Sequence, residues 1–291
     1  MFDTPVINVA IGLVFCFAAM SLAASTVTEA LASLVKLRAN TLVTGVQQML
    51  NDPQFSDLAL KVYRHALVHP QGDGHMQSRS RFWTYDGPSY IKAENFATAL
   101  VDVLQGASSD MAGLRDAVDR IQDAQIKQLL GGMLARAGND ADKVRAQVAA
   151  WFDTAMERVS GAYKRQAQLI CFLAALAMSA AMNVDATHVV TTLWANPDRA
   201  REVAVQLGQH GAGDPQVAAT MDQLAQLPIG YDVLPACDTP ARVACVRDHG
   251  VPGVTLLGWL VTAVASVFGA PFWFDLLGKL VQLRGSGPKP G

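Results

Sequence analysis

The sequence predicts an all-α membrane protein with three transmembrane helices, a helical cytoplasmic domain and a small disulfide-stapled extracytoplasmic domain. The first observation behind this prediction is a set of three apolar runs, at 5–28, 166–184 and 253–274. Each is close to or above the roughly 20 residues that a helix needs to cross a hydrocarbon core about 30 Å thick. The second observation is the composition, because only 16% of the 291 residues are charged, whereas soluble domains carry about 25%.

Basic residues beside the apolar runs predict how the chain crosses the membrane. Three pairs flank the runs: Lys36 with Arg38, Lys164 with Arg165, and Lys279 with Arg284. Cytoplasmic ends of membrane helices collect Lys and Arg, and all three pairs lie on one side if the N-terminus is outside. The segment 183–252, with 4 Lys+Arg and 8 Asp+Glu, then forms an acidic outside loop. We therefore predict an outside N-terminus and a cytoplasmic C-terminus.

This topology divides the chain into seven segments. They are an extracytoplasmic N-terminus (1–4), transmembrane helix one (5–28), a helical cytoplasmic domain (29–165), transmembrane helix two (166–184), an extracytoplasmic loop domain (185–252), transmembrane helix three (253–274) and a cytoplasmic tail (275–291). A cleaved signal peptide, processed between Ser21 and Ser25, is the alternative for the first run. It would need a basic start and an apolar stretch of only about 7–15 residues. The sequence has neither, so we predict an uncleaved anchor.

Helical periodicity continues from two of the runs into the cytoplasmic domain. After the first run it persists from Thr28 to Leu50 with no Pro or Gly before Gly45, which predicts one long helix ending at Asn51. The other helices predicted in this domain cover 56–67, 93–104, 110–137 with an interruption at Gly131-Gly132, and a segment from 140 straight into the second run. We expect an all-helical domain hung between extensions of two spans.

The extracytoplasmic segment is predicted to continue as a helix past Asp185 to Asn196, followed by helices at 197–209 and 215–227. Beyond them lie Cys237 and Cys245, which an oxidising periplasm would allow to form a disulfide. Two free thiols are the alternative. Zinc is not expected, because the loop lacks two further well-spaced ligands.

Small residues recur every four positions in the third run, at Gly258, Thr262, Ser266 and Ala270. Such a stripe lets membrane helices approach closely. It serves either a three-helix bundle within one chain or self-association, and we expect a homo-oligomer because three spans bury little alone. Pro271 is predicted to kink or end this run, and an ion pair is expected between Asp275 and Lys279, four residues apart.

The clearest candidate metal site combines His65 and His69 with Asp73 and His75 in the following segment. Two imidazoles at this spacing on a helix can share one metal. However, Ala66 stands where a metallohydrolase helix places a Glu after the first His. A pair of ordinary surface histidines is the favoured interpretation.

A basic and aromatic run follows, with Arg79, Arg81, Trp83 and Tyr85. These residue types suit lipid headgroups or a protein partner, and an ordinary loop pinned by its aromatic side chains is the alternative. Nucleic acid is not expected, because two arginines in a barely basic domain are too few. The sequence contains no P-loop and no Gly-x-Ser-x-Gly elbow, and no cofactor or small-molecule substrate is indicated.

Six short pieces of the chain resemble a family of bacterial inner-membrane proteins without a known activity. They are Val6–Leu13 with Thr28–Ala32, Pro88–Ile91 with Phe96–Leu100, Val159–Arg165, and the Ala-Pro-Phe-Trp-Phe-Asp-Leu-Leu segment at 270–277. The resemblance implies a multi-pass protein of the bacterial inner (cytoplasmic) membrane.

Three functions are compatible with these patterns. The leading hypothesis is a non-enzymatic anchor or scaffold whose cytoplasmic helices bind protein partners. The second is a homo-oligomeric pore or membrane-acting effector. The third is a metal-dependent membrane hydrolase that uses His65, His69 and Asp73.

Overall fold

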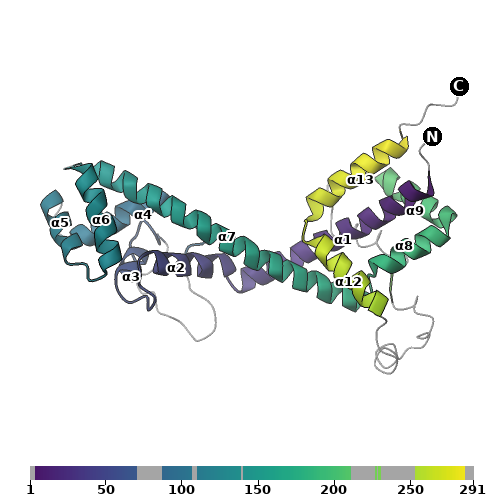
Figure 1. The fold of residues 1–291 in the computed structure, drawn as a ribbon, viewed down its shortest axis with the longest axis horizontal. Helices are drawn as coiled ribbons and strands as arrows, with labels where there is room; N and C mark the ends of the chain where they lie inside the picture. Colours follow the sequence, from purple (N-terminus) through teal and green to yellow (C-terminus); the bar gives the residue numbers. More distant parts are fainter. Residues whose placement is uncertain are drawn as a thin grey trace. The chain divides into compact units, whose positions relative to one another are not determined.

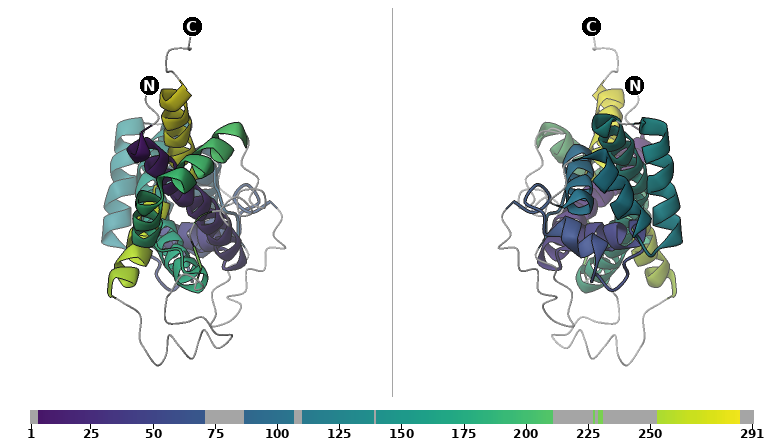
Figure 2. Two further views of the ribbon diagram at one scale, coloured as in Figure 1. Left: turned by 90° about the vertical axis from the view of Figure 1, so that its right-hand side faces the viewer. Right: turned by 90° about the vertical axis from the view of Figure 1, so that its left-hand side faces the viewer.

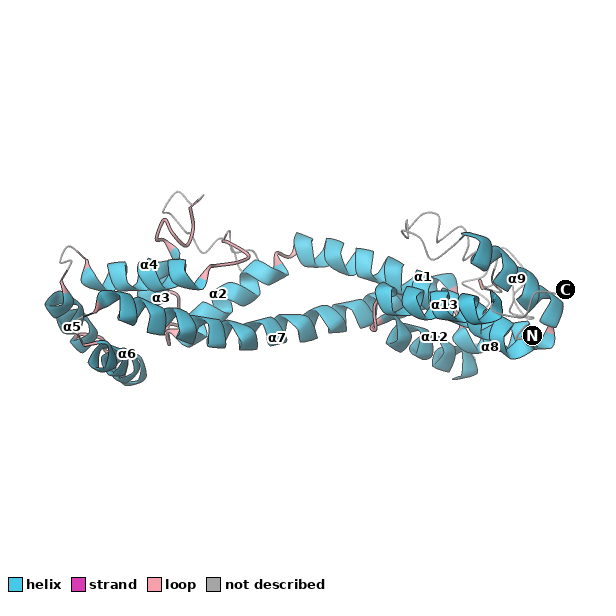
Figure 3. Cartoon of the chain, turned by 90° about the horizontal axis from the view of Figure 1, so that it is seen from above, coloured by secondary structure: helices cyan, strands magenta, loops and turns pink. Residues whose placement is uncertain are grey.

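A computed structural model describes residues 4–70, 87–106, 110–138, 140–210, 227, 229–230 and 253–285 of the chain. Across these ranges the structure is helical and contains no strand (Figure 3). The helices are α1 (Pro5–Leu34), α2 (Leu37–Met49), α3 (Leu58–Tyr63), α4 (Ala93–Gln105), α5 (Met111–Asp119), α6 (Ala124–Ala137), α7 (Ala141–Met182), α8 (Ala186–Ala195), α9 (Pro197–His210), α12 (Gly253–Ser266) and α13 (Ala270–Gly285) (Figure 1). The predicted helical class is confirmed.

The chain divides into two compact units. Unit 1 comprises Met1–Ala30 and Ala167–Gly291, and unit 2 comprises Leu31–Gln166. The two boundaries fall inside α1 and α7.

Two helices, α1 and α7, are long and apolar enough to cross a membrane. The third predicted span differs from a single helix, because α12 and α13 meet at a bend of 98°. The break comes after Ser266, a few residues before the kink expected at Pro271, and Gly269 takes a φ of 88° in it. Such a positive φ favours glycine. Within the described ranges there are therefore two candidate spans, or three if the bent pair counts as one.

Unit 2 is built around one apolar core from α2 to α6 and the first part of α7. Val144, Val148 and Phe152 of α7 face this core, and the rings of Phe96 and Phe152 stack with centroids 4.2 Å apart. This part of α7 therefore turns an apolar face to the core of unit 2. α7 continues without a break through 42 residues, which confirms that the last helix of unit 2 runs into the second apolar run.

Two predicted helices of unit 2 are interrupted elsewhere than expected. The long helix predicted from Thr28 to Asn51 is broken after Leu34, where Lys36 takes a left-handed φ of 45°. The helix predicted over 110–137 breaks between α5 and α6, where the Asp123 carboxylate accepts a hydrogen bond from the Ile126 N–H at 2.8 Å and caps α6. α6 then passes through Gly131 and Gly132, because its buried apolar face outweighs the low helix propensity of glycine.

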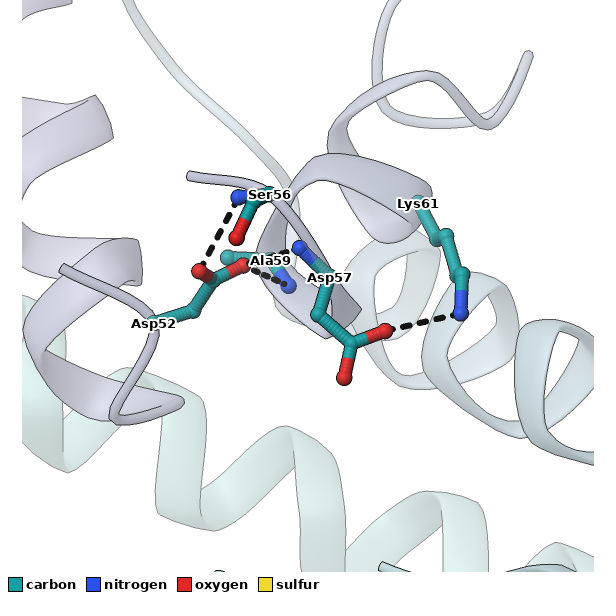
Figure 4. Close-up of polar contacts among 5 residues, drawn as sticks. All are labelled: Asp52, Ser56, Asp57, Ala59 and Lys61. Carbon is teal, nitrogen blue, oxygen red and sulfur yellow. Dashed lines mark hydrogen bonds and ion pairs between the residues drawn. The ribbon is translucent and has the colours of Figure 1, made fainter. Parts of the chain in front are cut away.

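Asp52 organises the turn between α2 and α3 (Figure 4). Its Oδ1 accepts a hydrogen bond from the Ser56 N–H at 3.0 Å, and its Oδ2 accepts from Asp57 at 2.9 Å and Ala59 at 3.2 Å. Burial disfavours the charged form, but these backbone donors outweigh it and hold the pKa of Asp52 below its usual value. The nearby Asp57 forms an ion pair with Lys61 at 2.8 Å.

Unit 1 packs α8, α9 and α13 around the first half of α1. Residues of these four helices share one apolar core, with Leu193 of α8 so close to Gly12 of α1 that no side chain larger than hydrogen fits without movement. Consequently 72% of the apolar window of α1 is buried inside the protein, compared with 11% for α7.

α12 in unit 1 has its polar side chains inside and its apolar side chains outside. The covered residues are Thr255, Gly258, Trp259, Thr262, Ala263, Ala265 and Ser266, whereas the exposed ones are Val254, Leu256, Leu257, Leu260, Val261 and Val264. Water would disfavour this arrangement because each exposed apolar side chain loses the benefit of burial. It suits a hydrocarbon environment, in agreement with the membrane class.

Candidate functional site

Several buried polar side chains of unit 1 gather at a helix break between α7 and α8. α7 ends at Met182, Asn183 takes a left-handed φ of 50°, and α8 begins at Ala186. The Asp185 Oδ1 caps α8 by accepting from the backbone N–H of Thr187 at 2.8 Å and of His188 at 3.1 Å, and from the Thr187 hydroxyl at 2.6 Å. An N-cap of this kind satisfies N–H groups that have no partner inside the helix.

α12 closes the break from the other side. Its Thr262 hydroxyl is shared between the Val184 carbonyl at 3.1 Å and the Gly258 carbonyl of its own helix at 2.9 Å, and its Trp259 Nε1–H donates to the Asn183 Oδ1 at 3.1 Å. Gly258 lies directly against the Asp185 carboxylate, so that a Cβ at this position would overlap Oδ1. We call the five residues Asn183, Asp185, Gly258, Trp259 and Thr262 the polar junction.

A short segment after α9 also binds the junction. The Asn183 side-chain amide donates to the Gly230 carbonyl at 2.8 Å, and the Gly230 N–H donates back to the Asn183 carbonyl at 3.3 Å. Leu227 packs into the same apolar core as Val184. Irregular backbone is stable in a membrane only where protein groups satisfy its hydrogen bonds, and the junction has such partners in α12 and Gly230.

The predicted small-residue stripe of α12 and α13 lies on the covered side of unit 1. Gly258 and Thr262 belong to the junction, Ser266 accepts a hydrogen bond at its carbonyl from the Ser21 hydroxyl at 2.7 Å, and Ala270 is 5% exposed. The stripe is therefore occupied by contacts within one copy of the chain. The expected ion pair between Asp275 and Lys279 is present at 2.6 Å.

Chemically, the junction provides one buried carboxylate and one neighbouring imidazole. Asp185 is 6% exposed, and the His188 Nε2 lies 3.1 Å from the Thr192 hydroxyl. No group of three His, Cys, Asp or Glu side chains that could hold a metal occurs in the described ranges. The geometry is that of a hydrogen-bonded helix break that joins α8 to α12.

The histidine pair predicted as a metal candidate lies in unit 2. The His65 Nε2 is 3.7 Å from an Asp102 carboxylate oxygen, and its Nδ1 accepts from the Leu67 N–H at 3.4 Å. Asp73, the third residue of the hydrolase hypothesis, lies outside the described residues, so that this hypothesis stays a prediction. Several predicted site residues lie outside the described residues: Asp73, His75, Arg79, Arg81, Trp83, Tyr85, Cys237 and Cys245. Cys16 and Cys171 are free thiols.

Sequence reasoning did not identify the polar junction. Asp185, followed by Thr187 and an apolar run, is a helix-start signal that could have located the break. The pattern of apolar residues instead predicts one continuous helix past Asp185. The contact with Gly258 joins positions far apart in the chain and has no local signature.

The chain was also compared with known proteins. No family model, no curated protein and no solved structure matches it. The function is therefore inferred from the residues and their geometry alone.

Proposed function

We propose that the chain is a non-enzymatic anchor or scaffold of the bacterial inner membrane, in which unit 1 is embedded in lipid and unit 2 binds a protein partner. The observation that carries this proposal is the contrast between the two units. α12 of unit 1 keeps hydroxyl groups inside and apolar side chains outside, whereas unit 2 keeps its large apolar side chains in a closed core. The two units suit two different solvents.

One helix connects the two environments in sequence. The first part of α7 contributes to the core of unit 2, and its last part is a candidate membrane span, with no helix break between them. A partner bound to unit 2 would thereby be attached to a segment that lipid holds. This attachment is the property that an anchor needs.

The partner contact is assigned to the start of α4. Among the described residues of unit 2, the exposed large apolar side chains are Leu31 and Leu34 at the end of α1, and Leu67 (41%) and Tyr90 (65%) on either side of the segment 71–86. The Asn95 side chain of α4 donates to the Leu67 carbonyl at 3.2 Å, which holds the segment after α3 beside α4. Aromatic residues are enriched at protein interfaces, where a Tyr ring supplies apolar area and its hydroxyl a hydrogen bond.

Photo-crosslinking in native membranes tests this assignment. A photoreactive phenylalanine analogue replaces Tyr90 in the full-length chain, and the matched control carries it at Asp119, whose side chain is 75% exposed but charged. We expect one discrete product with a second protein from position 90 and none from position 119. The scaffold proposal is wrong if neither position yields a product or if both yield the same diffuse ladder.

A homo-oligomeric pore is the second candidate, and one observation favours it. Only 11% of the apolar window of α7 is buried, so this helix offers a face that a second copy could cover. Crosslinked products that contain only this chain, together with ion conductance in reconstituted vesicles, would favour the pore. Products with another protein and vesicles without conductance would favour the scaffold.

A further inference from the structure

We propose that α12 and α13 form a re-entrant pair, which enters and leaves the membrane on one side, so that the two ends of the chain lie on the same side. This differs from the outside N-terminus and cytoplasmic C-terminus predicted from the basic flanks. The inference concerns unit 1 alone and does not depend on the scaffold proposal.

The lengths of the two helices argue against a crossing. α12 has 14 residues and α13 has 16, which correspond to about 21 Å and about 24 Å at 1.5 Å per residue. Each is shorter than a hydrocarbon core of about 30 Å. The bend of 98° between them prevents the two lengths from adding along one direction.

Contacts with α1 give the direction of the chain after the bend. The Ser21 hydroxyl of α1 donates to the Ser266 carbonyl at the end of α12, at 2.7 Å. Four residues nearer the start of α1, the Phe17 ring lies 4.9 Å from the Trp273 ring of α13. As the chain passes from α12 into α13, it therefore moves toward the first residues of α1.

The remaining part of α13 is long enough to reach the beginning of α1. From Trp273 to the end of α13, and from Phe17 back to the start of α1, the helical length is about 18 Å in both cases. Leu280 and Val281 of α13 and Ile7 of α1 pack against the same apolar core. Accordingly, the last turn of α13 and the first turn of α1 lie at the same end of unit 1 in both Figure 1 and Figure 2.

The bend itself is suited to lipid. Phe268 and Phe272, on either side of it, are 65% and 49% exposed, and no charged residue lies between them. The Trp273 Nε1–H donates to the Ala265 carbonyl at 2.8 Å, and the Gly269 N–H donates to the Ser266 carbonyl at 3.2 Å. Backbone groups in hydrocarbon need such partners, and the exposed surface of the bend is aromatic.

The basic residues after the bend do not require a cytoplasmic C-terminus. Lys279 is paired with Asp275 at 2.6 Å, so that Lys279 adds little net positive charge to the flank on α13. The four basic residues beside the other two runs are enough to set the orientation by the positive-inside rule.

Protease protection of epitope tags tests the proposal on the full-length chain. One tag is placed at each terminus, and a third is inserted at position 139, between α6 and α7. Intact spheroplasts are treated with protease, and detergent-permeabilised ones show that every tag can be cut. We expect the two terminal tags to respond alike and the tag at 139 to respond oppositely.

Two results would overturn the proposal. Opposite responses of the terminal tags would mean that the bent pair crosses the membrane as one span. Identical responses of all three tags would mean that α1 does not cross the membrane. The two termini would then share one side for a reason other than a re-entrant α12 and α13. A second variant, with the alanine pair Phe268→Ala and Phe272→Ala, should keep the same tag pattern if the contacts with α1 fix the direction of α13.

Discussion

Gly258→Ala provides a direct test of the polar junction. Alanine adds one methyl group, which at this position overlaps the Asp185 carboxylate. The two helices would have to separate, or Asp185 would have to leave the position in which it caps α8. Overpacking costs about 1–3 kcal/mol and loss of an N-cap costs about 0.5–2 kcal/mol. We therefore expect a loss of about 2–3 kcal/mol in the free energy of unfolding.

Thermal unfolding of the purified protein in detergent measures this loss. At about 2–4 °C per kcal/mol for a chain of this size, the midpoint should fall by about 4–12 °C. Gly253→Ala in the same helix is the matched control, because a Cβ there meets nothing within 4 Å. Its midpoint should stay within about 2 °C of the wild type, since alanine is also the better helix former.

A double-mutant cycle identifies the cause. Asp185→Ser keeps a good capping residue but removes the carboxylate that the new methyl group meets. Gly258→Ala should therefore cost less in the Asp185→Ser background, with a coupling energy of about 1 kcal/mol or more. An unchanged midpoint for Gly258→Ala, or the same cost in both backgrounds, would refute the close contact between α12 and the break.

The remaining predictions concern single groups. Asp52→Ala should destabilise unit 2 by about 1–3 kcal/mol because three backbone donors lose their acceptor. In the wild type the pKa of Asp52 is lowered in the folded state, so the carboxylate stabilises the fold above the unfolded-state pKa of about 3.9. Unfolding measured from pH 6 to pH 2 should show this stabilisation lost as the pH falls through the folded-state pKa. The Asp52→Ala variant should not show this loss. Thr262→Val, which is nearly the same shape, should lower the midpoint in detergent by an amount equivalent to about 1–3 kcal/mol, because a buried carbonyl loses its donor; no change would mean that another group replaces it. Phe152→Ala should cost about 3–5 kcal/mol by creating a cavity in the core of unit 2, which urea unfolding followed by circular dichroism would measure. Finally, thiol labelling of Cys237 and Cys245 in intact cells should require a reductant, and labelling without one would show that the disulfide is absent.

Features that depend on neighbouring residues in the chain could be predicted from the sequence. Apolar runs of sufficient length predicted the membrane class, and helical periodicity predicted that the last helix of unit 2 continues into the second apolar run. Both signals are repeated over many residues, so a few exceptions do not alter them. The ion pair between Asp275 and Lys279 was also predictable, because it lies within one helix.

Features that depend on a single residue or on a distant partner were not predictable. The break at Lys36 has no Pro or Gly, and a left-handed conformation at a lysine has no sequence signal. The stripe from Gly258 to Ala270 was recognised as a packing surface, but its main partner, the break at Asp185, is more than 70 residues away in the chain. The third span, predicted at 253–274, also includes the bend at Gly269, because the residues before and after the bend are mainly apolar and hydropathy does not distinguish them.

The polar junction has a consequence for the order of synthesis. Asn183 and Val184 leave the ribosome long before their hydrogen-bond donors, because Trp259 and Thr262 follow 76 and 78 positions later. Until α12 is made, the Asn183 Oδ1 and the Val184 carbonyl lack these two donors, and an unpaired acceptor of this kind would be costly in hydrocarbon. A chain that stops before α12 would never gain the donors of Trp259 and Thr262. We therefore expect such a truncated product to be degraded by membrane proteases faster than the full-length protein, in which the acceptors of Asn183 and Val184 are paired.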